Sequence, residues 1–259
     1  MGSNGFQSAL YTRGRHLVLG SYYRLIQWNY ERELLARTHR TVGGRVKTYE
    51  LYNRHGRDRM LQAIESLCSD ESTVIDVGAN VGIYSLALAA DAPNRHIVAV
   101  EPVPDVIEQL VTNIELNGFD DRIEVKQCCL GAETTDVEFY VSTYTELSSR
   151  TAEGAERWEA TVTGTETVHQ KRLDEIVEET NPPDIVKIDV EGAAAEVLAG
   201  GRHTLETIQP IVVLEPHTEE LSSDEPAAAR SILEAYGYNI DEHGTFWVAK
   251  PQRHHNNHC

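Results

Sequence analysis

The sequence predicts an α/β fold with a Rossmann-like, mostly parallel sheet. From residue 73 onward, short apolar runs typical of buried strands alternate with segments of helical periodicity. Such alternation is typical of βαβ units and a parallel sheet. The stretch VIDVGANVGIYS, residues 74–85, joins the first of these strands to its helix through a glycine-containing turn. With 259 residues and 41% hydrophobic composition, the chain can form one large domain or a domain with an extension.

The first 59 residues follow a different pattern. Apolar side chains recur every three to four positions over residues 8–40, with arginines between them, which predicts one or two helices. Gly43 and Gly44 end this pattern, and we expect a short strand over 46–53 and a helix over 57–68. Residues 1–59 are thus predicted to form a basic, mainly helical N-terminal extension.

The alternating part supplies the remaining elements in order. Strands are expected over residues 73–77, 96–102, 122–131, 134–143, 160–170, 184–190, 210–216 and 244–250. Helices are expected over residues 81–92, 105–118, 173–180, 191–201 and 227–238, and Gly118 is a usual helix stop. These elements predict one domain over residues 60–250, followed by a polar tail over 251–259.

The charge of the chain is strongly negative and unevenly distributed. The formal net charge is −18, with 5 Lys and 18 Arg against 41 acidic residues. An acidic composition poor in lysine favours solubility at very high salt and hence a halophilic source; an ordinary acidic cytosolic enzyme is the alternative. Residues 1–59 carry a net charge of +7 and residues 60–259 one of −25. Such asymmetry indicates a charged partner.

The basic extension has three candidate partners. We favour docking on the acidic surface of the chain's own domain. Residues 8–40 could instead lie on an anionic membrane as a peripheral helix. Nucleic acid is the least favoured partner, because a body with a net charge of −25 repels a phosphate backbone. The sequence predicts no particular oligomeric state.

The composition of the chain also indicates the cellular compartment in which it works. No apolar run approaches the ~18–20 residues that cross a bilayer, and the first residues lack the apolar core of a signal peptide. The cysteines at positions 68, 128, 129 and 259 form no CxxC pair. We therefore expect a cytoplasmic protein with free thiols and no structural zinc, peripheral to the inner face of the membrane if the extension binds lipid.

The turn DVGANVG predicts a nucleoside ligand. It lacks the middle glycine of the dinucleotide fingerprint GxGxxG. Glu101 ends the next strand, 23 residues after Gly78, where a carboxylate can accept hydrogen bonds from both ribose hydroxyls. Asp76 adds negative charge beside the turn, which suits a cation better than a phosphate. S-adenosylmethionine, a nucleoside that carries a sulfonium, meets these demands; the alternative is a bare turn whose glycines serve packing.

Four segments carry a resemblance to a known family. In this order, VIDVGANVGIYSLALA, VAVEPVPD…LVTNIELNG, VKIDVEGAAAEVLAGG and PIVVLEPH resemble motifs of the FkbM-type S-adenosylmethionine-dependent methyltransferases. The match runs over residues 73–216. The resemblance implies the seven-stranded class I methyltransferase sheet with an antiparallel last strand. It also implies methyl transfer to oxygen, mostly on sugar hydroxyls or natural products.

The resemblance further implies site residues. It places the methionine part of the cofactor on the first motif, and the ribose and adenine at the ends of the next two strands. The residues implied for the cofactor are Asp76, Gly78, Ala79, Asn80, Gly82, Tyr84, Glu101, Pro102, Cys129 and Leu130. Asp189 and Glu191 match the motif KIDVEG, whereas Ala194 stands where the family commonly has an acid. We expect position 194 to lie on a helix surface.

The carboxyl ends of parallel strands predict where the chemistry lies. Asp189 and Glu191 lie at this end of one predicted strand, and Glu215 and His217 at this end of the next. A hydroxyl nucleophile needs a proton acceptor, and we take Asp189 as the base or substrate orienter ahead of the other three. Alternatives are a helix cap for Asp189 and a surface loop for His217. These groups could also ligate a metal ion, but no tight spacing supports one, so no metal is predicted.

Functions from two classes are compatible with these residues. The first is an O-methyltransferase that acts on a small molecule or a glycan, which the acids at positions 189, 191 and 215 favour. The second is a cofactor-binding subunit without catalysis; an RNA methyltransferase is a further alternative, because NIELNG also occurs in some archaeal tRNA methyltransferases. The segment NPPD, residues 181–184, resembles the NPPY motif of amino-group methyltransferases, but it precedes its strand and is predicted to be a turn.

Overall fold

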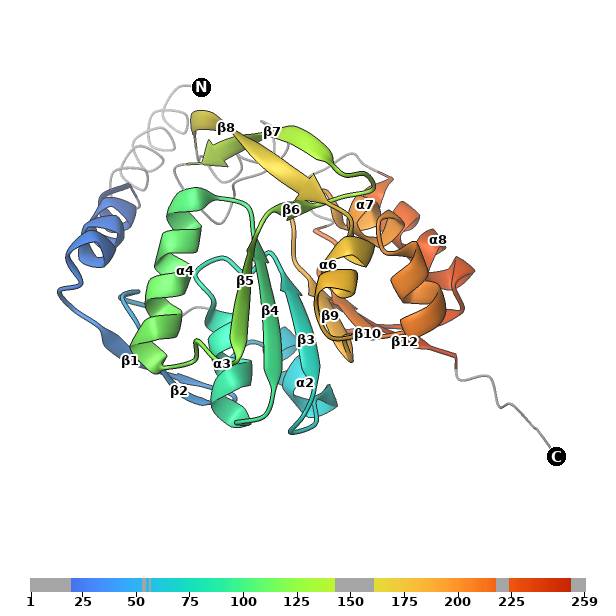
Figure 1. Cartoon of the computed structure of the whole chain (residues 1–259), viewed down its shortest axis with the longest axis horizontal. Coiled ribbons are helices and arrows are strands. Elements are labelled where there is room, and N and C mark those ends of the chain that lie inside the picture. Colours follow the sequence, from blue (N-terminus) through green and yellow to red (C-terminus); the bar gives the residue numbers. More distant parts are fainter. Residues whose placement is uncertain (1–19, 53–54, 56, 143–160, 218–223, 253–259) are drawn as a thin grey trace, which may run out of the picture.

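The computed structural model describes residues 20–52, 55, 57–142, 161–217 and 224–252 (Figure 1). The helical pattern over residues 8–19 and most of the polar tail lie outside these ranges. Within them, the chain forms a central sheet with helices on both faces, a small second sheet, and an N-terminal helix and hairpin. No helix in these ranges is long and apolar enough to cross a membrane.

The central sheet has seven strands in the order β11-β12-β10-β9-β3-β4-β5. Its parallel strands are β3 (Thr73–Val77), β4 (His96–Glu101), β5 (Ile123–Gln127), β9 (Ile185–Ile188) and β10 (Ile211–Leu214). The last strand, β12 (Trp247–Pro251), runs antiparallel to both neighbours, β10 and β11 (Tyr238–Glu242). The predicted sheet is confirmed. The edge strand β11 was not predicted from the sequence. Tyr238 is its only buried residue, so it lacks the apolar run of a buried strand.

Helices cover both faces of this sheet (Figure 1). One face carries α2 (Arg59–Leu67), α3 (Ile83–Asp91) and α4 (Pro104–Asn117). The other carries α6 (Leu173–Glu179), α7 (Ala194–Ala199), the short π-helical segment η3 (Thr204–Ile208) and α8 (Glu225–Ala235). Successive strand residues face opposite sides, so Val74 packs with the first set of helices and Ile75 with the second. Burial on both faces explains why apolar runs identified these strands.

A second, three-stranded sheet lies over one end of the central sheet (Figure 1). It has the order β6-β8-β7, with β6 (Cys129–Leu130), β7 (Thr135–Ser142) and β8 (Val162–Lys171). The single strand expected over 122–131 is therefore two strands. The chain leaves the central sheet after β5, and β6 pairs with β8 instead.

The N-terminal part begins as the sequence predicts and then departs from it. Residues 20–32 are helical, but β1 (Arg37–Thr41) and β2 (Gly44–Thr48) form an antiparallel hairpin. The prediction of helix up to residue 40 is therefore wrong, and the strand expected over 46–53 ends at Thr48. Thr38 and Thr41 are β-branched residues that favour a strand. A two-residue turn follows them, and Gly44 after it adopts a φ of +137° that is open mainly to glycine.

The hairpin packs closely on α3 and α4. Asn117 of α4 accepts a hydrogen bond from the Lys47 amide and donates one to the Lys47 carbonyl, both at 2.7 Å. Val46 is fully buried against α3. A Cβ on Gly43 would lie 2.1 Å from the carbonyl oxygen of Ala87, so only glycine fits this contact. The described part of the N-terminal extension is thus bound tightly to the α/β domain.

Candidate active site

A cavity of about 900 Å³ lies at the carboxyl ends of β3, β4, β9 and β10. This is where ligands bind in open α/β sheets. Most of the predicted site residues line it, namely Gly78, Ala79, Asn80, Tyr84, Glu101, Pro102, Cys129, Leu130, Asp189, Glu191, Glu215 and His217. The fold therefore brings together residues from four strand ends that are far apart in the sequence.

The turn between β3 and α3 depends on residues with positive φ. Gly78 has a φ of +76° and Asn80 one of +51°, a conformation that Asn tolerates better than most residues. A Cβ on Gly78 would lie 2.0 Å from the carbonyl oxygen of Asp189. The amides of Gly78 and Ala79 both donate to the Val100 carbonyl at 3.0 Å. Backbone contacts to two neighbouring strands thus determine the shape of this turn.

Gly82 has a packing role that the sequence did not predict. It precedes α3 with a φ of +88°, and a Cβ there would lie 2.4 Å from Leu110 Cδ1 on α4. Gly82 itself does not line the cavity, although its neighbours Val81 and Ile83 do. Glycine at position 82 therefore allows α3 and α4 to pack closely.

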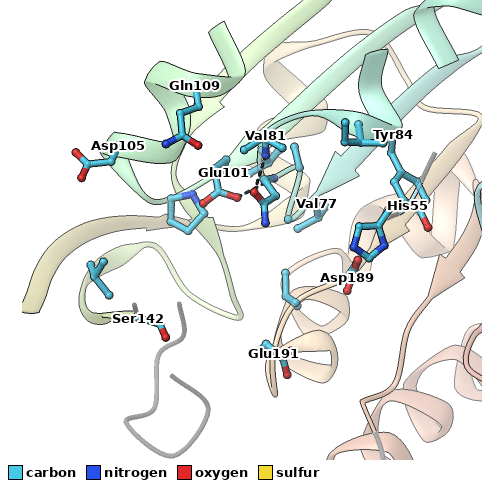
Figure 2. Close-up of a pocket in the computed structure, with 18 of the residues that line it drawn as sticks. His55, Val77, Val81, Tyr84, Glu101, Asp105, Gln109, Ser142, Asp189 and Glu191 are labelled. Atoms are coloured by element: carbon cyan, nitrogen blue, oxygen red, sulfur yellow. Dashed lines mark hydrogen bonds between the residues drawn. The ribbon is translucent and has the colours of Figure 1, made fainter. Parts of the chain in front are cut away.

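Glu101 lies near the middle of the cavity (Figure 2). Its Oε2 accepts a hydrogen bond from the Asn80 amide at 3.0 Å, and its Oε1 accepts one from the Val103 amide at 3.1 Å. Burial raises the pKa of this carboxyl to about 7, although the two amides act in the opposite direction. Each carboxylate oxygen keeps a lone pair for a ligand hydroxyl. This geometry fits the predicted contact with a ribose.

The cavity extends to both sides of Glu101. In Figure 2, Gln109 and Ser142 lie on one side of it, and Tyr84 and Asp189 lie on the other. The lining of the cavity also includes the apolar group Pro102, Cys129, Leu130 and Phe139, from the end of β4 and the small sheet. Apolar walls with a few polar groups suit a flat heterocycle such as adenine.

A buried ion cluster supports the Asp189 side of the cavity. Lys187 Nζ lies 2.8 Å from Asp76 Oδ1 and 3.7 Å from Asp189 Oδ2, and it donates to the Gly78 carbonyl at 2.9 Å. Burial disfavours the charge of Lys187, but the two carboxylates outweigh it and raise its pKa. Asp76 is fully buried and also accepts a hydrogen bond from Ser85 at 2.7 Å. Asp76 is therefore placed beneath the cavity, where it acts on the site through Lys187.

Asp189 and His217 form a hydrogen-bonded pair on the cavity wall. His217 Nε2 lies 3.0 Å from Asp189 Oδ1, and its Nδ1 lies 3.7 Å from Glu191 Oε2. Burial opposes the charge of Asp189, but Lys187 and His217 outweigh it and hold the pKa of this carboxyl well below its usual range. Burial also opposes the charge of His217, and its carboxylate neighbours nevertheless raise its pKa.

Glu215 joins this pair from the end of β10. Burial first, and then the charge of Asp189, raise the pKa of Glu215. One ligand atom each from Asp189, Glu215 and His217 lies within 4.8 Å of the others. Such a set could hold a cation after small side-chain movements. The sequence analysis named these groups as possible metal ligands without predicting a metal. It could not show that they lie close together, because Asp189 follows β9 and the other two follow β10.

Asp189, the segment NPPD and Ala194 occupy three different positions around β9 and α7. The N-cap residue of α7 is Ala193 and makes no side-chain cap, so Asp189 does not cap that helix. The segment NPPD precedes β9, as predicted, but it is irregular with a bend at Asp184 rather than a regular turn. Asp184 accepts a hydrogen bond from the Thr73 amide at 2.9 Å, at the amino ends of β9 and β3, away from the cavity. The expected surface location of Ala194 is wrong, because this first residue of α7 packs into the core.

Residues from the N-terminal part complete the site and were not predicted. The Tyr84 hydroxyl donates to Asp58 Oδ2 at 2.6 Å, and His55 Nδ1 lies 3.5 Å from the same oxygen. His55 and, from the helix at 20–32, Tyr22, Tyr23 and Arg24 line the cavity. Asp58 was recognisable as a helix cap from its position. Helical periodicity gave no sign that the preceding helix would reach the strand ends.

Comparisons with known proteins place the chain in a family. The family model described as the methyltransferase FkbM domain matches residues 76–240. Methyltransferase sdnD of Sordaria araneosa is 28% identical over 202 residues, which cover 68% of this chain and 76% of that protein. Hexuronic acid methyltransferase AglP of Haloferax volcanii is 25% identical over 175 residues, which cover 67% and 68%. A crystal structure of methyltransferase FkbM from Methylobacillus flagellatus is 19% identical, with a TM-score of 0.49, and the match covers 76% of this chain and 46% of that one. Since the family model spans well over half of the chain, the protein belongs to the FkbM-domain methyltransferases.

Proposed function

We propose that this methyltransferase uses S-adenosylmethionine to methylate a hydroxyl on a sugar, a glycan or another small molecule. The observation that supports this most directly is that Glu101 and the Asp189–His217 pair line the same cavity. We assign Glu101 to the ribose and the pair to a polar acceptor. A donor and an acceptor held in the same cavity would gain much of the rate from placement alone.

The chain's residues fit this cofactor. Glu101 would accept the ribose hydroxyls, Pro102 and Leu130 would face the adenine, and the turn at Gly78 and Ala79 would face the methionine part. The cavity also has several carboxylates, which suit the positive sulfonium. When bound, the cofactor supplies a methyl group open to in-line displacement.

The acceptor side offers an orienting group and a base. Asp189, ionised because of its low pKa, would accept a hydrogen bond from the acceptor hydroxyl. Glu215, whose pKa is raised by burial and by the charge of Asp189, would take the proton as the oxygen bonds to the methyl carbon. The electron pair of the broken carbon–sulfur bond stays on sulfur. His217 would hold Asp189 in this orientation.

The N-terminal helix suggests the chemistry of the acceptor. Tyr22 and Tyr23 line the cavity and offer aromatic faces on which a sugar ring can pack. Arg24 is exposed beside them and makes no ion pair within the part of the chain that the structure describes; its Nε donates to the Gly20 carbonyl at 3.2 Å. Its remaining donors suit a carboxylate. A uronic-acid sugar, the class named for the AglP relative, is therefore the first acceptor to test.

Calorimetric titration with S-adenosylmethionine in molar KCl tests the proposal. We expect the wild type to bind, and Glu101→Ala to lose binding because the ribose contact is gone. Glu115→Ala is the matched control, since Glu115 is an exposed residue of α4 outside the cavity. A folded wild-type protein that does not bind would contradict the cofactor assignment. Binding without methyl transfer to any acceptor would favour the alternative of a non-catalytic subunit.

A further inference from the structure

The N-terminal helix has an apolar outer surface. Leu25 and Trp28 on the helix, and Leu34 and Leu35 just after it, are 47%, 49%, 56% and 52% exposed. We call these four residues the outer patch. In Figure 1 the helix lies at the edge of the molecule, away from the C-terminal strands. Four large apolar side chains gathered on one short segment are uncommon on a soluble surface without a partner.

The opposite face of the helix is firmly attached. Ile26 and Tyr30 are buried, and Tyr30 packs against Tyr49 with its ring centroid 5.6 Å away. Asn29 donates to the Tyr49 carbonyl at 2.6 Å and accepts from the Leu35 amide at 2.9 Å. These contacts hold the outer patch in place as a preformed surface.

On the helix and the hairpin that follows it, exposed basic side chains outnumber the exposed acids Glu31 and Glu33. Arg32 is exposed on the helix, and Arg37, Arg40, Arg45 and Lys47 are exposed on the hairpin. Within the described ranges, none of the five makes an ion pair with an acidic residue of the domain. The sequence predicts docking of the basic extension on that acidic surface, but the described contacts of the extension are mainly apolar packing and hydrogen bonds. These positive charges remain available to a partner.

We propose that the outer patch binds the surface of an anionic lipid bilayer. Trp and Leu on one face of a helix flanked by arginines are the composition of an interfacial helix. The apolar side chains would enter the headgroup region, and the arginines would pair with lipid phosphates. The rest of the chain would face away, because residues 60–259 carry a net charge of −25 and would be repelled.

This orientation connects the membrane to the cavity. The same helix lines the cavity with Tyr22, Tyr23 and Ile26. An acceptor attached to a lipid would thus be presented next to the site. The binding proposal itself does not depend on the proposed reaction.

Vesicle flotation of the full chain tests this inference. We expect co-flotation with phosphatidylcholine vesicles that contain about a third phosphatidylglycerol, and at least ~tenfold weaker binding to pure phosphatidylcholine. Leu25→Ser/Trp28→Ser and Arg32→Glu/Arg40→Glu should each reduce binding by ~tenfold or more. Val111→Ser is the matched control, because Val111 is an exposed apolar residue of α4 that is not part of the patch. Raising the KCl concentration should weaken the electrostatic part of the binding.

Two results would overturn the inference. The first is a folded wild-type protein that does not float with the anionic vesicles, or whose flotation the patch variants do not change. The second is a dimer in analytical sedimentation that the variant Leu25→Ser/Trp28→Ser dissociates. In that case the patch would be the interface between two copies of the chain. S-adenosylmethionine binding, measured on the same samples, should be unchanged in every patch variant, so failure here is distinguishable from failure of the proposed function.

Discussion

The two sides of the cavity are held by different kinds of interaction. Around Glu101, backbone amides of Asn80 and Val103 position the carboxylate, and the neighbouring turn is determined by backbone contacts. Around Asp189, charged side chains position one another, with Lys187 beneath it and His217 beside it. The first side should therefore be sensitive to changes of shape, and the second to changes of charge.

The largest effect is expected where a side chain would intrude on the turn. Gly78→Ala places a Cβ 2.0 Å from the Asp189 carbonyl oxygen at a φ of +76°. We expect a loss of ~3 kcal/mol or more of unfolding free energy, measured in urea. Gly118→Ala is the control: its φ is +65° with no atom within 4 Å, so strain alone should cost ~1 kcal/mol. Equal losses would contradict the close approach at Gly78.

Removing the buried cation should have a comparable effect. Lys187→Met leaves the carboxylate of Asp76 buried without its ion-pair partner. We expect a loss of ~3–5 kcal/mol in unfolding free energy. Adding Asp76→Asn to this variant should restore part of that loss, because the uncompensated charge is then gone. Additive losses in the double variant would show that the two residues are not coupled.

Asp189→Asn separates chemistry from binding. We expect turnover to fall by ~10²–10⁴-fold while S-adenosylmethionine binding is retained. The variant should also alter acid stability. The folded pKa of Asp189 lies below its usual 3.8, so its stabilising contribution is complete above about pH 4 and is lost as the pH falls through the folded value. Unchanged turnover would show that our assignment of Asp189 is wrong.

Glu101 should also make stability depend on pH, with a smaller effect and in the direction opposite to that of Asp189. Its folded pKa is about 7, above the usual 4.5, so the folded state holds this proton more tightly. The resulting contribution to stability is complete below about pH 4.5 and is lost as the pH rises to 7. Cofactor affinity should rise over the same interval, as the ionised form accepts both ribose hydroxyls. Glu101→Gln should abolish both dependences, and a wild-type affinity that does not vary with pH would contradict the ribose contact.

The smallest effect is expected from chelation. Because we assign proton transfer to Glu215 and orientation to Asp189, EDTA should leave turnover unchanged. A large loss that Mg²⁺ or Mn²⁺ restores would instead mean that Asp189, Glu215 and His217 share a cation.

Local patterns in the sequence predicted most of the central sheet and its helices. TVIDV and DIVKIDV are recognisable because strands covered on both faces must be almost wholly apolar. The FkbM-type motifs pointed to the turn after β3, to Glu101 and to the acids after β9 and β10, since these residues occupy strand ends in a regular βαβ arrangement. Family membership is confirmed by the match to residues 76–240.

Only the tertiary structure decided how these residues work together. Lys187 meets Asp76, and Ala194 enters the core, through packing between segments that no local pattern relates. The N-terminal hairpin replaced a predicted helix for the same reason: its pairing partner and the α3 and α4 surface outweigh helical periodicity. Local propensity depends on neighbouring residues alone, whereas burial, pKa and the lining of a cavity depend on contacts that exist only once the chain has folded.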